Sequence, residues 1–132
     1  MPDSRIETAI AANAGFYTFP DENIRFPYGL KNTNMKIKPD LVKAFRKKLV
    51  ILLGELDNDA SLGIFRKTDQ AMEQGAHRLE RGTNFYNATT ALTSEFNLEF
   101  SWKIDTVANV GHDYKGMSKG AAEWIKTDLD KK

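Results

Sequence analysis

Three polar side chains stand where two apolar segments end, and their types could do acid–base chemistry. Asp57 and Asp59 follow the apolar run 49–53, and His112 follows a segment that ends near Val110. If both segments are neighbouring parallel strands, they lie about 4.8 Å apart, so their loops can bring a carboxylate onto an imidazole. A carboxylate that accepts from one ring nitrogen fixes the tautomer and leaves the other nitrogen basic. Such a pair would be two thirds of a nucleophile–base–acid triad.

The segments that must position these residues follow one another in the order of an α/β protein. The run 49–53 is apolar without alternation, which is typical of a strand covered on both faces. Residues 98–110 begin with a period of two and predict a strand near a sheet edge. Strands that alternate with helices imply right-handed crossovers and a parallel sheet. The predicted fold class is therefore α/β, with a small, mostly parallel sheet and flanking helices.

Three helices are expected around these strands. The first begins at Thr68 and ends near residue 75, and a charged link at 78–81 separates it from the second, which Thr83 would cap. The second helix would bury a stripe of Phe85, Ala88, Leu92 and Phe96. The last would turn Met117, Ala121, Trp124, Ile125 and Leu129 inward, with a charged tail at 126–132 that frays.

The amino-terminal third has a different character. Residues 6–14 are apolar and fit either a buried strand or a weak helix. Residues 16–40 form a long loop, because Pro20, Pro27 and Pro39 fix φ and remove donors. We expect most of the rings in this loop to fasten it to the core, and the alternative is that some line a pocket: Phe16, Tyr17, Phe19, Phe26 and Tyr28.

Composition narrows the classes of function. The chain has 132 residues with 19 basic and 18 acidic side chains, which fits one domain over residues 1–132 and argues against nucleic acid as a partner. It has no cysteine, which excludes a disulfide scaffold and a cysteine-ligated zinc site. No apolar run approaches about 18 residues, so no membrane partner is expected. We expect no cofactor and no metal, and the compartment stays open, with the cytoplasm slightly favoured.

Five blocks of sequence, in order, resemble the carboxyl-terminal half of a bacterial α/β-hydrolase. They lie at 12–18, 26–30, 49–57, 74–82 and 110–113. In that family the triad acid ends a strand in a Gly-x-x-Asp pattern, which Gly54 to Asp57 match, and the histidine follows glycine, as His112 follows Gly111. The resemblance thus implies that Asp57 is the triad acid and His112 the base. The block 74–82 is similar to a subgroup of hydrolases with no assigned substrate.

The nucleophile of that family has no counterpart in the expected place. The serine elbow should precede the acid, but the only serine before Asp57 is Ser4, which is not in an elbow. Ser118 lies in a Gly-x-Ser-x-Gly sequence, yet it follows the histidine and no strand leads directly into it, so we expect an ordinary surface serine. The resemblance implies hydrolysis of an ester or related acyl bond in a complete protein. This chain by itself is predicted to be inactive.

The missing serine elbow also implies that this chain associates with another polypeptide. The resemblance implies that the strand at 6–14 would lie beside central strands of the complete family fold that this sequence does not contain. An exposed apolar edge is a template for pairing with another chain. We therefore expect self-association or docking onto an amino-terminal half.

Two other classes of function stay open. A non-catalytic interaction module or truncated pseudo-hydrolase, built on a hydrolase remnant and using the loop 16–28, would require that Asp57 and His112 lie beyond hydrogen-bonding distance. A metal-dependent phosphatase would use Asp57 and Asp59, although Asp59 is also a rival acid or the start of a turn. Of the remaining candidates, His77 is most simply a solvated residue, and the basic run is most simply a soluble helix end rather than a phosphate site: Arg46, Lys47 and Lys48.

Overall fold

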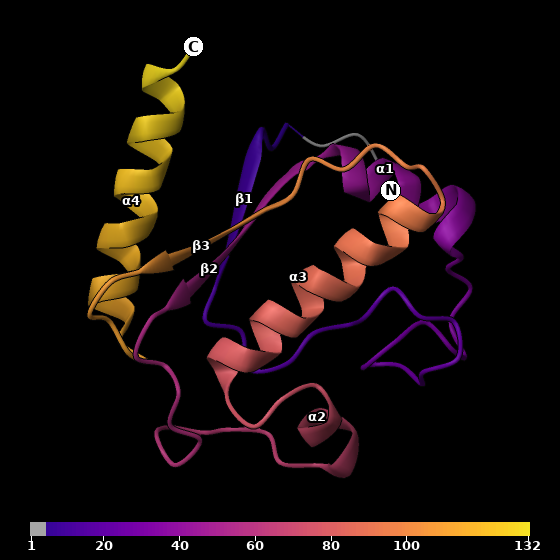
Figure 1. Cartoon of the computed structure of the whole chain (residues 1–132), viewed down its shortest axis with the longest axis horizontal. Coiled ribbons are helices and arrows are strands. Elements are labelled where there is room, and N and C mark those ends of the chain that lie inside the picture. Colours follow the sequence, from indigo (N-terminus) through magenta and orange to yellow (C-terminus); the bar gives the residue numbers. More distant parts are fainter. Residues whose placement is uncertain (1–4) are drawn as a thin grey trace.

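A computed structural model describes residues 5–132, in which a three-stranded parallel sheet has helices on both faces (Figure 1). The strand order is β1-β2-β3, and both pairs are parallel. This architecture confirms the predicted fold class. Ser4, the serine that precedes Asp57 in the sequence, lies outside the described residues. The elements are β1 (Thr8–Ala12), a π-helical turn η1 (Ile37–Leu41), α1 (Val42–Arg46), β2 (Lys48–Gly54), α2 (Asp69–Glu73), α3 (Arg78–Glu95), β3 (Lys103–Val107) and α4 (Tyr114–Asp130).

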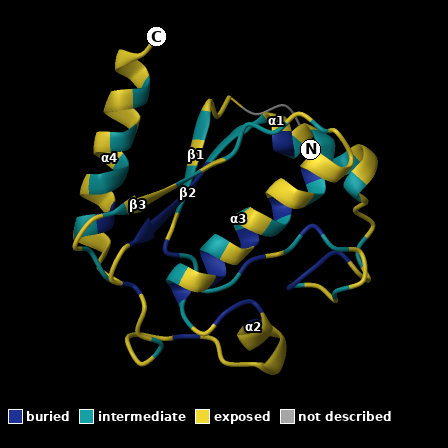
Figure 2. Ribbon diagram, viewed as in Figure 1, coloured by how far each residue is buried: buried dark blue, intermediate teal, exposed yellow. Residues whose placement is uncertain are grey.

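The central strand β2 is covered on both faces, which explains its uninterrupted apolar sequence. Successive side chains of a strand point to opposite faces. Ile51 and Leu53 pack with Phe85 of α3, whereas Val50 and Leu52 pack with Met117 of α4. Figure 1 shows the two helices on opposite sides of the sheet, and Figure 2 shows β2 as buried.

Helix α3 begins earlier than predicted. The N-cap is His77, whose Nδ1 accepts a hydrogen bond of 3.2 Å from the backbone N–H of Glu80, so the prediction of a cap at Thr83 is wrong. The charged link at 78–81 was also wrong, because Arg78 and Arg81 are 2% and 0% exposed. Their guanidinium groups donate to backbone carbonyls, which allows charged side chains to be buried at a helix start.

The inner face of α3 is more polar than the predicted stripe. Thr89 and Thr93 are buried, whereas Phe96 is exposed. Each threonine hydroxyl donates to the carbonyl oxygen four residues earlier, so burial leaves no hydroxyl proton unpaired. Of the predicted stripe, Phe85 is the one buried residue.

The last strand and helix also differ in detail from the expectation. Strand β3 is shorter than 98–110, because the two residues directly before it bond to α1 rather than extend the sheet: the backbone N–H of Ser101 donates to the carbonyl of Phe45, and the indole N–H of Trp102 donates to that of Ala44. β3 does lie at a sheet edge, as predicted. In α4, Ile125 and Leu129 are exposed instead of inward-facing, and the helix continues through most of the charged tail to Asp130.

The structure of the amino-terminal segments decides between the strand and helix alternatives for residues 6–14 and shows where rings of the long loop lie. Residues 8–12 form the strand β1 rather than a helix, and residues 13–36 contain no helix or strand of the sheet. Tyr17 and Tyr28 are buried in the core, but Phe26 is exposed. Tyr17 stacks on Phe85 with ring centroids 4.6 Å apart, which fastens the loop to α3. Among residues 5–132, no helix has the length and apolar character needed to cross a membrane.

Candidate active site

The structure brings Asp57 and His112 together where β2 and β3 end. His112 Nδ1 lies 3.0 Å from Asp57 Oδ2. The carboxylate is 1% exposed, whereas the imidazole side chain is 37% exposed. A buried acceptor therefore holds one nitrogen of a ring that solvent can reach, and an acceptor at Nδ1 leaves Nε2 free to take a proton.

Backbone geometry fixes Asp57 from two directions. Its N–H donates to Gly54 at the end of β2, at 3.0 Å, and its carbonyl accepts from Leu79 in the first turn of α3, at 3.1 Å. Its second carboxylate oxygen, Oδ1, lies 3.7 Å from Nη1 of Arg78. Burying a carboxylate is costly unless a counter-charge accompanies it, and Arg78 supplies one.

Asn13 ties the segment before His112 to the ends of the first two strands. Its Oδ1 accepts from the backbone N–H of Gly54 at 2.8 Å, and its Nδ2 donates to the carbonyl of Gly111 at 3.1 Å. Its φ of 45° lies in the left-handed region, which asparagine tolerates better than most residues. The sequence interpretation missed this role, although an asparagine directly after an apolar strand was an available signal.

The block 74–82 anchors the long amino-terminal loop beside this pair. Gln74 accepts from the backbone N–H of Tyr17 at 2.9 Å and donates to its carbonyl at 2.6 Å. Arg81 donates to the carbonyls of Gly15 and Gly75, at 2.7 and 2.9 Å. The block 74–82 thus has a structural part in holding the loop. The prediction of a charged link at 78–81 did not include this part.

The two carboxylates of the phosphatase alternative have separate partners. Asp59 is exposed and accepts from the backbone N–H and the hydroxyl of Ser61, at 2.9 and 2.6 Å. These hydrogen bonds, led by the hydroxyl, lower the pKa of Asp59. In the part of the chain that the structure describes, no cluster of three or more acidic or histidine side chains could hold a metal ion. The geometry favours the turn role for Asp59.

Ser118 does not lie on an elbow. It is an exposed residue inside α4, and Gly116 before it packs closely on Val110. An elbow would require a sharp turn between a strand and a helix. Ser118 and His112 both border one cavity of about 270 Å³, whose lining is Ile10, Ala12, Asn13, His112, Asp113, Tyr114, Met117, Ser118 and Ala121.

The other polar candidates have structural partners. His77 caps α3 and is half-buried, so the prediction that it is simply solvated is wrong. Arg46 forms an exposed ion pair of 3.1 Å with Glu99. Lys47 caps α1, whereas Lys48 already belongs to β2. None of these residues joins the Asp57–His112 pair.

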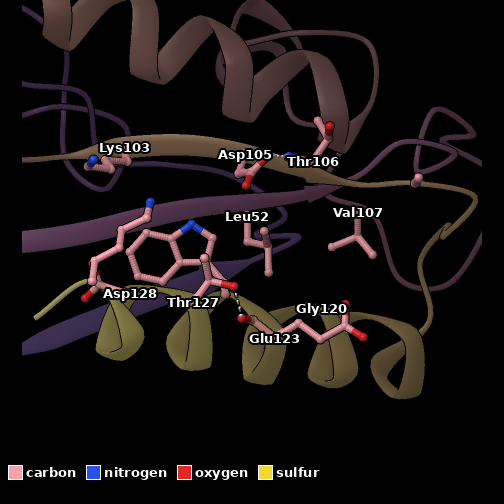
Figure 3. Close-up of a pocket in the computed structure, with 12 residues that line it drawn as sticks. Leu52, Lys103, Asp105, Thr106, Val107, Gly120, Glu123, Thr127 and Asp128 are labelled. Atoms are coloured by element: carbon pink, nitrogen blue, oxygen red, sulfur yellow. Dashed lines mark hydrogen bonds between the residues drawn. The ribbon is translucent and has the colours of Figure 1, made fainter.

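A second, larger hollow lies away from this pair. It has a volume of about 420 Å³ and lies between β3 and α4 (Figure 3). Leu52 and Val107 line it from the sheet, and Glu123 and Thr127 line it from the helix. Neither Asp57 nor His112 borders it, so the larger hollow is separate from the Asp57–His112 pair.

No family model matches the chain, and no curated protein matches it significantly. Solved structures do match. Poly(aspartic acid) hydrolase-1 from Sphingomonas sp. KT-1 superposes with a TM-score of 0.86 at 41% identity, over 92% of this chain and 46% of that one. LpqC, a poly(3-hydroxybutyrate) depolymerase from Bordetella parapertussis, gives a TM-score of 0.82 at 30% identity, over 91% of this chain and 40% of that one. The chain thus spans less than half the length of either structure.

Proposed function

The chain has a partial α/β-hydrolase fold, which confirms the family resemblance, and from this premise we propose that it carries the acid and the base of a serine-type hydrolase. Asp57 is the acid and His112 is the base. The nucleophilic serine and the oxyanion hole come from a polypeptide segment that this sequence does not include. The chain supplies two members of the triad and gains activity when the third is added.

One observation carries this proposal: the 3.0 Å contact between His112 Nδ1 and the buried Asp57 Oδ2. In the reaction, Nε2 of His112 takes the proton of the serine hydroxyl as that oxygen attacks an acyl carbon. The same nitrogen then gives the proton to the leaving group. Asp57 keeps the proton of Nδ1 in place and stabilises the imidazolium that forms between these two steps.

The substrate class that we propose is an ester or a related acyl bond. The two structural neighbours are named for poly(aspartic acid) and poly(3-hydroxybutyrate). The first of these polymers is joined by amide bonds and the second by ester bonds, and one triad mechanism serves both because each presents an acyl carbon. These names support acyl transfer to water as the reaction.

The geometry does not favour the interaction-module alternative. That alternative required Asp57 and His112 to lie beyond hydrogen-bonding distance, and they are 3.0 Å apart. The outer edge of β1 has no strand beside it among the described residues. We propose that edge as the contact for the segment that carries the serine.

A fusion protein tests the proposal. The part of the Sphingomonas hydrolase that this chain does not cover is joined to this chain, and hydrolysis of a short-chain chromogenic ester is measured. We expect activity from the fusion and none from this chain alone. Asp57→Asn should lower the rate by about 10⁴-fold, because the imidazole would adopt the wrong tautomer.

The two histidines of the chain provide a matched control. His112→Ala should abolish hydrolysis by the fusion, whereas His77→Ala removes a helix cap and should leave the rate close to that of the parent. A folded fusion without activity would contradict the proposal. A burst of chromophore from the isolated chain that His112→Ala abolishes would contradict the claim that the nucleophile lies elsewhere.

A further inference from the structure

We propose that Arg78 is a positioning residue whose charge holds the Asp57 carboxylate in the state that His112 needs. This inference rests on the proposed function for its meaning in catalysis, but it is argued from the geometry of this chain. Arg78 was expected to be part of a charged link between two helices, and it is 2% exposed.

The negative charge of Asp57 needs a compensating cation other than His112. Oδ2 is used by His112, and Oδ1 has no hydrogen-bond partner among the described residues. A neutral imidazole, the form that acts as a base, cannot balance the carboxylate. The guanidinium of Arg78, 3.7 Å from Oδ1, is then the cation that accompanies this buried charge.

The guanidinium of Arg78 is itself held in position by two backbone carbonyls and an aromatic ring. Nη1 donates to the carbonyl of Leu62 at 3.1 Å and Nη2 to that of Ile64 at 2.8 Å. The ring of Phe65 lies 5.0 Å from its Cζ. The planar guanidinium can donate to two neighbouring carbonyls at once, and these two hydrogen bonds keep its charge beside Asp57.

The loop that Arg78 fastens also lies against the base. A Cβ atom placed on Gly63 would be 3.5 Å from Cδ2 of His112 and 3.7 Å from Nη2 of Arg78. Gly63 therefore lies between the guanidinium and the imidazole. Arg78, Asp57 and His112 form one contiguous unit through this loop.

Loss of the charge at residue 78 has a defined chemical consequence. A buried carboxylate beside a neutral imidazole would be uncompensated, so the pair would take up one proton from the solvent. Either the imidazole keeps a second proton, or the carboxyl takes one and donates it to Nδ1. In both states Nε2 carries a proton, and His112 can no longer accept one from a nucleophile.

Nuclear magnetic resonance on this chain tests the proposal without any hydrolysis. Two-bond ¹H–¹⁵N correlation spectra at mildly alkaline pH show whether Nε2 of His112 carries a proton, and His77→Asn assigns the signals. We expect a bare Nε2 in the parent and in Arg78→Lys, which keeps the charge. We expect a protonated Nε2 in Arg78→Gln, which keeps hydrogen-bond donors but loses the charge.

Arg81 is the matched control, because it lies on the same helix, is 0% exposed and makes no ion pair with Asp57. Arg81→Gln should leave Nε2 bare. The proposal is overturned if Arg78→Gln keeps a bare Nε2, if Arg78→Lys resembles Arg78→Gln, or if folded Arg81→Gln gives the same change.

A second measurement covers the case in which Arg78→Gln does not fold. If charge balance is what Arg78 supplies, removing the carboxylate with Asp57→Asn should restore folding of Arg78→Gln, seen as a cooperative thermal transition. A double variant that stays unfolded overturns the proposal. Because neither readout uses an ester, their failure leaves the hydrolase proposal standing, and an inactive fusion leaves these results unaffected.

Discussion

A Cβ atom placed on Gly54 would lie 2.5 Å from the carbonyl oxygen of Val110 and 2.7 Å from that of Gly111. The last residue of β2 therefore has to lack a side chain for the segment before His112 to cross it. Leu56 donates to the same Val110 carbonyl at 2.8 Å, so the two strand ends are joined directly. The glycine of the Gly-x-x-Asp pattern thus allows the segment before His112 to pass close to the end of β2, near Asp57.

Gly54→Ala should displace residues 110–112 and break the Asp57–His112 contact. Overpacking of this kind costs about 1–3 kcal/mol, since the neighbouring atoms are backbone and cannot rotate away. Urea unfolding measures the loss, and the ¹⁵N shifts of His112 report the contact. Gly15→Ala is the control, because a Cβ there meets nothing within 4 Å and should change neither quantity.

Tyr17 should make stability depend on alkaline pH. Burial, and secondly the negative charge of Asp57, raise the pKa of Tyr17 from 10.0 to about 12. Between these values the unfolded chain releases the tyrosine proton while the folded chain keeps it, so stability falls as pH rises. The pKa difference corresponds to roughly 2–3 kcal/mol, fully present below pH 10 and lost by about pH 12.

Tyr17→Phe isolates this contribution. The tyrosine hydroxyl is buried and has no hydrogen-bond partner among the described residues, so its removal should not destabilise the protein at neutral pH. In urea unfolding across the alkaline range, the variant should lack the loss assigned to Tyr17. The exposed Tyr114→Phe should behave as the parent does. Equal alkaline losses in parent and Tyr17→Phe would refute the assignment.

The free edge of β1 should cause self-association of the isolated chain. Unpaired backbone groups on an edge strand accept another strand, and a charged side chain on the edge discourages this. Light scattering should show a mass that rises with concentration, and Ala9→Lys on β1 should reduce the rise. Ala122→Lys, at an exposed position of α4, should not. A parent that remains monomeric at high concentration would count against the edge as a contact.

Much of the fold could be predicted from the sequence, because it depends on patterns among neighbouring residues. The run 49–53 predicted a doubly covered strand, and the structure confirms this because its two sets of side chains meet α3 and α4. The resemblance to α/β-hydrolases in the Gly-x-x-Asp and Gly-His patterns indicated Asp57 and His112 as a pair, whereas the residues alone left Asp59 open as a rival acid. These signals survive in sequence because strand period and turn chemistry are properties of neighbouring residues.

The start of α3 shows where local reasoning failed. Arg78 and Arg81 were predicted to lie in a charged link, and the carbonyls that make their burial possible include distant ones at Leu62, Ile64 and Gly15. Asn13 was missed for the same reason, since its partners Gly54 and Gly111 are 41 and 98 residues away.

The sequence by itself determined the α/β class and the covered central strand, because each depends on spacing along the chain, and the resemblance to a known family singled out Asp57 and His112 at the strand ends. The tertiary structure decided which charges are buried and what holds the carboxylate opposite the imidazole. Those features depend on hydrogen-bond partners and counter-charges that folding brings from remote segments, and no local pattern encodes them.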